Sequence, residues 1–289
     1  MLNILVTGAN GQLGSEIQLI SSYYPQYTFT FADRTILDLS NLCTMEDFFE
    51  TKSFDAIINC AAYTAVDRAE SDTELANTIN HRFVSMLAKI AKKNHISLVH
   101  ISTDYVFNGQ NYRPYIETDP TEPQGVYGKT KCDGENAILS VASANTVIIR
   151  TSWVYSSFGN NFVKTMLRLG RERDSLGVIF DQVGTPTYAR DLAQAILEIL
   201  PNIQNESPEI YHYSNEGCAS WYDFAKAIFE LSEVECLINP ITTDQYPTPA
   251  TRPHYSLLNK TKIKNDFNLT IPYWRDSLKE CLITLGETK

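Results

Sequence analysis

Tyr127 and Lys131 form a YxxxK pair at the start of a segment with helical character. Residues four apart on a helix lie on the same face, so the phenol and the ammonium would be neighbours. A free tyrosine has a pKa of about 10, and we expect the ammonium of Lys131 to lower the pKa of Tyr127 toward neutrality. Such a tyrosine can exchange a proton with a carbonyl oxygen. Taken alone the spacing is weak, because Tyr and Lys on an ordinary surface helix produce it by chance.

A glycine-rich turn lies near the N-terminus, directly after the first apolar run. Gly8, Gly11 and Gly14 are spaced as GxxGxxG between the run Ile4–Thr7 and a helical segment that begins at about Leu13. Glycines at these places permit a tight turn, a close approach of backbone to phosphates, and close packing of the helix. The helix N-terminus adds N–H donors and partial positive charge. This context favours a dinucleotide pyrophosphate site over a turn without a ligand.

Charged residues follow the second apolar run, Thr28–Ala32. Asp33 can accept hydrogen bonds from the adenosine ribose hydroxyls, which favours NADH. Arg34 follows at once and can pair with a 2′-phosphate, which favours NADPH, although a solvated loop charge is an equally good interpretation. The two neighbours therefore leave the choice of cofactor open. Asp38 and Leu39 lie where a carboxylate could meet the adenine amino group.

Hydroxyl side chains end the apolar run Leu98–Ser102, which continues into Thr103 and Asp104. Ligands of open α/β sheets bind at the carboxyl ends of the strands. A hydroxyl there can polarise a substrate carbonyl while hydride arrives from a nicotinamide, so Thr103 and Tyr127 would complete a site without a metal. The five histidines show no ligand spacing, and His100, inside an apolar strand, is more often a satisfied core residue than a base.

The elements that must position these residues alternate along the first half of the chain. Apolar runs predict buried strands at Ile4–Thr7, Thr28–Ala32, Ala56–Cys60, Leu98–Ser102 and Thr146–Arg150. Segments of helical period or length lie between them at Leu13–Ser21, Thr44–Thr51, Asp72–Asn94 and Tyr127–Val141. This pattern predicts an α/β fold with a doubly wound parallel sheet of the Rossmann type.

The alternation loosens after about residue 150, which predicts a smaller C-terminal lobe. Here the sequence indicates helices at Asn160–Arg173, Tyr188–Leu200 and Trp221–Leu231, the last introduced by Ser220, with a short strand at Val178–Asp181. The segment Gln245–Pro253 is rich in Pro and Thr and is expected to be an irregular loop.

Composition narrows the setting of the protein. The formal net charge is -10, and Lys and Arg are scattered among acidic residues rather than gathered in a stripe, so nucleic acid is not an expected partner. The six cysteines lack both zinc-site spacing and the density of a disulfide scaffold. No basic leader or long apolar run is evident, so we expect a cytoplasmic protein without a membrane segment.

Several stretches together resemble the dTDP-4-dehydrorhamnose reductase family of extended short-chain dehydrogenases. Besides the glycine turn and the YxxxK pair, they are Asn59–Asp67, Ser102–Phe107, Arg150–Tyr155, Gly159–Phe162, Asp181-Gln182, Pro186-Thr187 and Tyr246–Pro253. The resemblance spans nearly the whole chain. It implies NAD(P)H-dependent reduction of the C4 ketone of dTDP-4-dehydro-β-L-rhamnose, the last step in the synthesis of activated rhamnose for polysaccharides.

The resemblance also implies roles for individual residues. Tyr127 would be the proton donor, Thr103 would tune the site near it, and Lys131 would position the nicotinamide ribose. Thr103, Asp104 and Trp153 would contact the deoxysugar, with the indole of Trp153 as an apolar wall; a core tryptophan is the less favoured alternative. Together with the pattern above, the dinucleotide would be lined by Gly8, Gly11, Gln12, Leu13, Gly14, Asp33, Arg34, Asp38, Leu39, Ala61, Ala62, Tyr63, Thr64, Ile101, Tyr127 and Lys131.

We expect residues 1–150, with roughly 184–213, to form the NAD(P)-binding domain, and roughly 151–183 and 214–289 to form the lobe that binds the dTDP-sugar. Some members of the family dimerise through a magnesium ion held by glutamates. Glu16 matches one such ligand, but Arg190 stands where a second carboxylate would be needed. We therefore expect no metal, and either a monomer or a homodimer.

Two other functions stay open from the sequence. Another nucleotide-sugar epimerase or dehydratase of the same superfamily would share the turn, the hydroxyl and the YxxxK pair, and Asp104 could serve such a dehydratase. A non-catalytic regulator, like the β subunit of methionine adenosyltransferase, would also bind dinucleotide, although the intact Thr103, Tyr127 and Lys131 count against it.

Overall fold

The computed structural model describes residues 1–288, and its largest feature is a six-stranded parallel sheet with the order β10-β5-β4-β3-β1-β2. Its strands are β1 (Leu2–Thr7), β2 (Tyr27–Ala32), β3 (Ala56–Asn59), β4 (Ser97–Thr103), β5 (Thr146–Thr151) and β10 (Glu209–His212). Every neighbouring pair is parallel. The first five strands and the parallel, doubly wound fold were predicted, whereas β10 was not.

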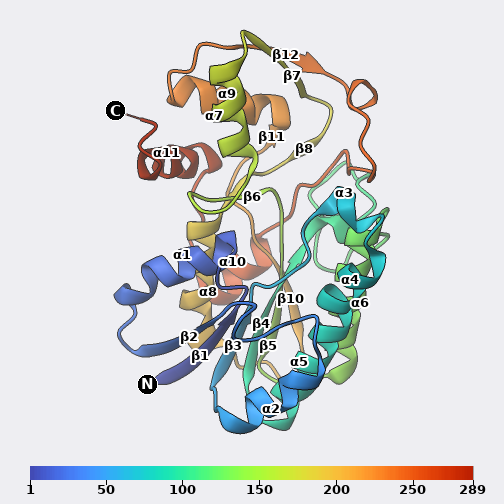
Figure 1. Cartoon of the computed structure of the whole chain (residues 1–289), viewed down its shortest axis with the longest axis vertical. Coiled ribbons are helices and arrows are strands. Elements are labelled where there is room, and N and C mark those ends of the chain that lie inside the picture. Colours follow the sequence, from blue (N-terminus) through green and yellow to red (C-terminus); the bar gives the residue numbers. More distant parts are fainter. Residues whose placement is uncertain (289) are drawn as a thin grey trace.

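Helices cover both faces of this sheet (Figure 1). They include α1 (Gln12–Ile20) and α8 (Ala189–Ile199), which share a core with Ile4 and Val6, and α5 (Phe83–Lys93), which shares one with Leu5. Neighbouring residues of one strand thus point into different cores. Since both faces are covered, each strand is a continuous apolar run rather than an alternating one.

The strand order reverses beside β1. The chain leaves β1 through α1 to reach β2 on one side, and later returns to β3 on the other side. Such a reversal opens a crevice at the carboxyl ends of the strands, where ligands of these sheets bind. The turn that contains Gly8, Gly11 and Gly14 therefore lies at the expected ligand position.

The helix predicted for Asp72–Asn94 is interrupted. The structure has α3 (Val66–Ala69), α4 (Thr73–Asn77), a π-helical turn η2 (Thr78–Arg82) and then α5. Asn80, within η2, is fully buried and uses its side-chain amide for contacts outside the helix. Single π-helical turns of this kind are frequent at functional sites.

A smaller lobe lies at one end of the molecule, above the sheet in Figure 1. Its core packs α7 (Phe162–Glu172), α9 (Trp221–Leu231) and α11 (Trp274–Thr284) against the parallel pair β7 (Ser175–Ile179) and β12 (Leu237–Ile241). A capping box, in which Ser220 and Asp223 bond to each other's backbone, begins α9 as the sequence indicated. The strand β12 and the helix α11 were not predicted.

The remaining helices and strands belong to the sheet part, to the lobe or to the segments between them. They are α2 (Cys43–Thr51), α6 (Val126–Val141), β6 (Val154–Tyr155), β8 (Val183–Gly184), β9 (Thr187–Tyr188), β11 (Ala219–Ser220), α10 (Thr261–Phe267), η1 (Ser21–Tyr23), η3 (Asp104–Val106), η4 (Leu200–Asn202) and η5 (Thr243–Gln245). After the lobe begins, α8 and β10 return to the large sheet. The domain boundaries given above stay a prediction.

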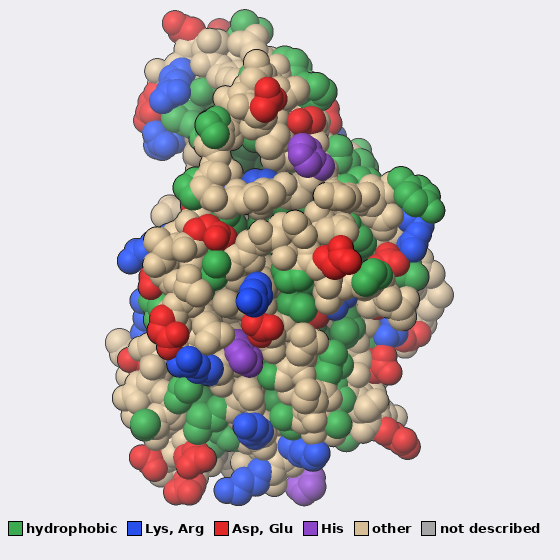
Figure 2. All heavy atoms as spheres, turned by 90° about the vertical axis from the view of Figure 1, so that its right-hand side faces the viewer, with side chains coloured by type: hydrophobic (Ala, Val, Ile, Leu, Met, Phe, Trp, Pro, Cys, Tyr) green, Lys and Arg blue, Asp and Glu red, His purple; other side chains and the backbone are tan. Residues whose placement is uncertain are grey.

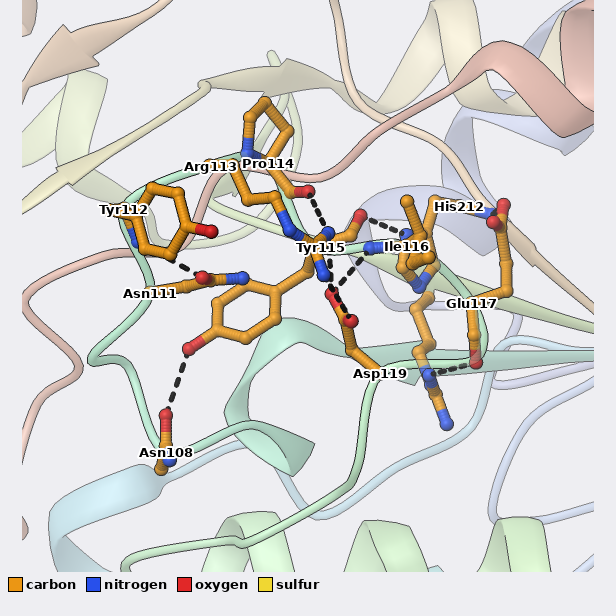
Figure 3. A network of polar contacts seen from close by, with 11 residues as sticks. Asn108, Asn111, Tyr112, Arg113, Pro114, Tyr115, Ile116, Glu117, Asp119 and His212 are labelled. Carbon is orange, nitrogen blue, oxygen red and sulfur yellow. Dashed lines mark hydrogen bonds and ion pairs between the residues drawn. The ribbon is translucent and has the colours of Figure 1, made fainter.

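The segment between η3 and α6 is held by its own polar contacts (Figure 3). Arg113 pairs with Asp119 at 2.8 Å, and Asp119 also accepts a hydrogen bond from the Ile116 amide at 2.9 Å. Tyr115 stacks on Phe107 with 4.1 Å between ring centroids. These contacts fix the path of the chain between β4 and α6, the two elements that carry most of the candidate catalytic residues.

The surface carries charges of both signs. Figure 2 shows Lys and Arg side chains interspersed with Asp and Glu, without a patch of one sign on the face in view. Among residues 1–288, no helix is long and apolar enough to cross a membrane.

Candidate active site

The glycine turn is packed tightly against the end of β3. Gly8 has a φ of +67°, and a Cβ atom there would lie 2.8 Å from the backbone of Ala61. A Cβ on Gly14 would lie 2.4 Å from the carbonyl oxygen of Gly8. Side chains are excluded at both positions, so the helix packs onto its own turn and the backbone stays open to a ligand.

The N-terminus of α1 faces this turn. Gly11 is the N-cap and provides no side-chain hydrogen bond, so the first N–H groups of the helix, from Gln12 to Gly14, are free for an anion. The Gln12 side chain donates to the Val154 carbonyl at 3.3 Å and accepts from Asn161 at 3.0 Å. The segment after β5 therefore borders the turn. This cradle fits a dinucleotide phosphate.

Charged residues predicted for the adenosine end lie in the loop after β2. The Asp33 carboxylate accepts from the Thr35 hydroxyl at 2.7 Å, and this bond holds the pKa of Asp33 below its usual value. Asp38 is bonded in the same way by Ser40, which lowers its pKa too. Arg34 is exposed. These side chains thus shape a solvated loop, with Leu39 half-buried behind it.

The loop from Ala61 to Thr64 follows β3 and is fastened by a residue that the sequence analysis missed. The Asn80 side chain accepts from the Tyr63 amide at 2.8 Å and donates to the Tyr63 carbonyl at 3.1 Å. Its Nδ2 also lies 3.1 Å from Oγ1 of Thr130 on α6. Asn80 therefore ties the candidate cofactor loop to the helix that carries Tyr127. An Asn in the middle of a long helical segment, where it is unfavourable, was the available signal.

Tyr127 lies in the first turn of α6, half-buried and edge-on to Tyr105 with 5.4 Å between ring centroids. Loss of hydration raises the pKa of Tyr127 to about 12, while the Thr103 hydroxyl favours the phenolate and Asp104 opposes it. The expectation that Lys131 lowers this pKa is wrong for this structure. The physical reason is that the Lys131 amine has other partners.

Lys131 is turned into the protein and is only 1% exposed. Its Nζ donates to the Ile101 carbonyl at 2.6 Å and lies 3.3 Å from Nε2 of His100. Burial lowers the pKa of Lys131 to about 8, against the opposing effect of Glu135. The amine is thus placed at the end of β4, beside the predicted cofactor residue Ile101.

Thr103 and Asp104 lie at the carboxyl end of β4, as predicted. Thr103 Oγ1 donates to Oδ1 of Asp104 at 3.0 Å and accepts from the Tyr105 amide at 3.3 Å. Asp104 is buried, and burial raises its pKa to about 6 against the opposing effects of the Ser256 and Thr103 hydroxyls, although its Oδ2 has no partner at hydrogen-bond geometry. An unpartnered buried oxygen next to a tyrosine hydroxyl suits a ligand with hydroxyl groups. Ser102 points to the opposite side and bonds to Glu135.

Trp153 follows β5 and has a φ of +48°, an unfavourable backbone conformation for a bulky side chain. Its indole stacks on Trp221 of the lobe with 3.6 Å between ring centroids and 10° between planes. Gly184 lies under the same ring, since a Cβ there would come within 2.8 Å of it. Trp153 as a whole is half-buried. Trp221, whose role the sequence did not indicate, therefore fixes the predicted sugar-contacting residue.

Glu16 and Arg190 are paired within the chain. Glu16 is fully buried, and its Oε2 lies 3.0 Å from Nε of Arg190, while Ser156 donates to Oε1 at 2.6 Å. Over residues 1–288, no three or more His, Cys, Asp and Glu side chains come together as a metal site would need. The absence of a metal stays a prediction.

The fold and these residues define the class. A parallel sheet with a glycine turn at the strand-order reversal, and a Tyr–Lys pair beside a threonine at the end of β4, is the arrangement of an extended short-chain dehydrogenase. The model of the RmlD substrate binding domain family matches residues 2–286. The chain therefore belongs to this family.

Several of its relatives carry the same name. The chain is 42% identical to the dTDP-4-dehydrorhamnose reductase of Aggregatibacter actinomycetemcomitans over 288 residues, covering 96% of this chain and 98% of that protein. The crystal structure of a dTDP-4-dehydrorhamnose reductase from Clostridium acetobutylicum is similar with a TM-score of 0.93 at 40% identity, covering 99% and 100% of the two chains. The enzyme of that name from Bacillus anthracis, crystallised with NADP, has a TM-score of 0.92 at 36% identity, covering 98% and 99%.

Proposed function

We propose that the protein is a dTDP-4-dehydrorhamnose reductase that uses NADPH or NADH. The observation that carries this function is the meeting of Tyr127, Thr103 and Lys131 with the glycine turn at one sheet edge, in a chain that matches reductases of that name over nearly its whole length. The reduction converts the C4 ketone of dTDP-4-dehydro-β-L-rhamnose to the alcohol of dTDP-β-L-rhamnose.

The glycine turn and the α1 N-terminus fit the pyrophosphate of a dinucleotide. When bound, the nicotinamide cofactor supplies the hydride. We assign its binding to Gly8, Gly11, Gln12, Leu13, Gly14, Asp33, Arg34, Asp38, Leu39, Ala61, Ala62, Tyr63, Thr64, Ile101, Tyr127 and Lys131. We assign this task to the sheet part of the molecule, and binding of the dTDP-sugar to the lobe.

Proton donation falls to Tyr127. Its raised pKa keeps the phenol protonated at neutral pH, which is the form that a reduction needs at the start. As hydride reaches C4, the oxygen becomes an alkoxide, a much stronger base than a phenolate, so the phenol can still give up its proton. The Thr103 hydroxyl, which favours the phenolate, eases that transfer.

Substrate recognition falls to the residues around this pair. Asp104 offers its unpartnered Oδ2 to a sugar hydroxyl, and Trp153 offers the exposed part of its ring to an apolar face of the sugar. The substrate and cofactor are metabolites of the cytoplasm, where we place the protein. With Arg190 filling the place beside Glu16, we propose a metal-independent monomer or homodimer.

The test is oxidation of NADPH or NADH by purified protein supplied with dTDP-4-dehydrorhamnose, with the product identified by mass and retention. We expect one cofactor oxidised for each sugar reduced. An epimerase would convert nucleotide sugars without net oxidation of cofactor, and a regulatory subunit would bind dinucleotide without turnover. Either result would overturn the proposed function.

A further inference from the structure

A chain of buried polar side chains runs beneath the candidate site and ends at Lys131. Thr7 Oγ1 donates to Oδ1 of Asn59 at 2.6 Å, and Nδ2 of Asn59 lies 2.9 Å from Nδ1 of His100. Nε2 of His100 lies 3.3 Å from Nζ of Lys131. All four side chains are 0–1% exposed. They come from β1, β3, β4 and α6, so the chain links the base of the glycine turn to the lysine.

Distances fix the direction of the hydrogen bonds. A separation of 2.6 Å between Thr7 and Asn59 is typical of O–H···O bonds and short for N–H···O, so the Asn59 oxygen faces the hydroxyl. The Asn59 nitrogen must then donate to Nδ1 of His100. Nδ1 is therefore unprotonated, and in the neutral ring the proton lies on Nε2. Burial and the neighbouring Lys131 hold the pKa of His100 well below its usual value, so the ring is neutral.

In this tautomer the Nε2–H of His100, a hydrogen-bond donor, points toward Nζ of Lys131. An ammonium has no acceptor for the Nε2–H, whereas a neutral amine does. Nζ contacts the Ile101 carbonyl and His100 on β4, and Glu135, one turn later on α6, is the charged group that acts on it. Glu135 is committed to Arg150 of β5, at 2.6 Å, and to Ser102. Lys131 thus has one good acceptor and no carboxylate of its own.

We propose that His100 is a positioning residue for the reduction: oriented by Asn59 and Thr7, its ring fixes the Lys131 amine at the end of β4 and disfavours the charged form. The inference rests on the function proposed above, which gives Lys131 a role toward the cofactor. An ordinary core position would be filled as well by an apolar side chain, without two hydrogen bonds that orient the ring and a third polar contact to a buried amine.

A consequence is that cofactor binding takes up a proton. The phosphates of a dinucleotide are negative and ribose hydroxyls accept hydrogen bonds from an ammonium, so binding favours charged Lys131. In the free protein burial lowers the pKa of Lys131 to about 8. Affinity for NADPH should therefore fall as pH rises through that value. A substitution that raises the pKa of Lys131 should move this fall in NADPH affinity to higher pH.

The experiment is a fluorescence titration of the whole protein with NADPH at a series of pH values from about 6 to about 10. Lys131→Met should remove the fall in affinity. His100→Gln offers the amine an acceptor oxygen, and Asn59→Asp forces the proton of His100 onto Nδ1 so that Nε2 becomes the acceptor. Both should move the midpoint upward by about one pH unit. His212 is also fully buried but does not belong to this row of polar side chains. His212→Gln is therefore the matched control and should leave the midpoint in place.

The inference is overturned if the midpoint stays in place in both folded variants, if Lys131→Met retains the fall, or if His212→Gln shifts it equally. Two variants at different positions in this row of side chains are used, so that the test remains possible if one of them does not fold. Circular dichroism shows whether each variant is folded. The titration contains no sugar. A correct midpoint shift in a protein without reductase activity would therefore sink the proposed function alone, and an active reductase without the shift would sink the role of His100 alone.

Discussion

The two ends of the proposed cofactor site differ in their contact with water. At the catalytic end, Thr103, Asp104 and Lys131 are at most 5% exposed, and burial moves the pKa of Asp104 and of Lys131 by about two units or more. At the adenosine end, Arg34 and Asp38 are exposed, and Asp38 is stabilised as an anion by a neighbouring hydroxyl.

This difference suggests that the buried end controls turnover and the exposed end controls the preference for NADPH or NADH. Loss of hydration shifts proton affinities by kilocalories and makes each polar contact expensive to remove. Solvated charges at a loop contribute little, because water and salt screen them. We therefore expect substitutions at the buried end to change turnover or stability by orders of magnitude, and those at the exposed end to change cofactor preference by small factors.

The largest effect is expected for Tyr127→Phe. Removal of the proton donor should lower kcat by about 10²–10⁴-fold, the usual contribution of general acid catalysis, with NADPH affinity largely kept because the ring still packs on Tyr105. Steady-state kinetics and a binding titration measure the two quantities. Tyr105→Phe is the matched control and should keep kcat near the wild-type value. Wild-type turnover by folded Tyr127→Phe would assign the proton to another donor.

A smaller effect is expected for Thr103→Val. The substitution preserves shape but removes the hydroxyl that favours the phenolate of Tyr127 and donates to Asp104. Loss of one such donor should lower kcat by about 10- to 100-fold and change KM little. Ser102→Ala, one residue earlier on the opposite side of β4, tests whether a lost hydroxyl on this strand has the same effect by itself. An equal loss of kcat in both variants would show that Thr103 has no specific role in the reaction.

The sequence predicts the buried end in outline and misses its details. The parallel sheet is legible because strands covered on both faces are continuous apolar runs, such as Ala56–Cys60. The edge strand β10, Glu209–His212, lacks such a run and was missed for that reason. The raised pKa of Tyr127 could not be predicted, because it depends on the burial of the ring and on the Lys131 amine being held elsewhere. The Ile101 carbonyl and His100 hold that amine, and these are contacts between residues far apart in sequence.

Asp104→Asn should make the protein more stable and less active. Burial raises the folded-state pKa of Asp104 to about 6, above its unfolded value, so the folded protein binds the extra proton between about pH 4 and pH 6. The wild type therefore loses stability as pH rises through that window. The neutral amide avoids this loss, and we expect its free energy of unfolding to exceed that of the wild type by about 1–3 kcal/mol at neutral pH.

Urea denaturation of the two proteins at about pH 5 and about pH 8 tests this sign. The gain of Asp104→Asn should be larger at the higher pH, while its kcat/KM for the sugar should be lower. Asp119→Asn, which removes a carboxylate paired with the Arg113 cation, whereas Asp104 has no cationic partner, should destabilise instead. A gain that is equal at both pH values would show that the pKa of Asp104 is not raised in the folded protein.

The smallest effect is expected for Arg34→Ala. Arg34 is exposed and next to Asp33, whose carboxylate is already engaged by Thr35, so the guanidinium is free to meet a 2′-phosphate but only in water. An exposed charge contact contributes about 0.2–1 kcal/mol, which corresponds to a roughly 1.4- to 5-fold rise in KM for NADPH with KM for NADH unchanged. Arg34→Lys, which keeps the charge, should lose less, and added salt should narrow the gap between wild type and Arg34→Ala. Equal changes in KM for both cofactors would deny the phosphate contact. A change of 100-fold or more would contradict the contrast between the two ends, because it would require Arg34 to act from a site as desolvated as that of Lys131.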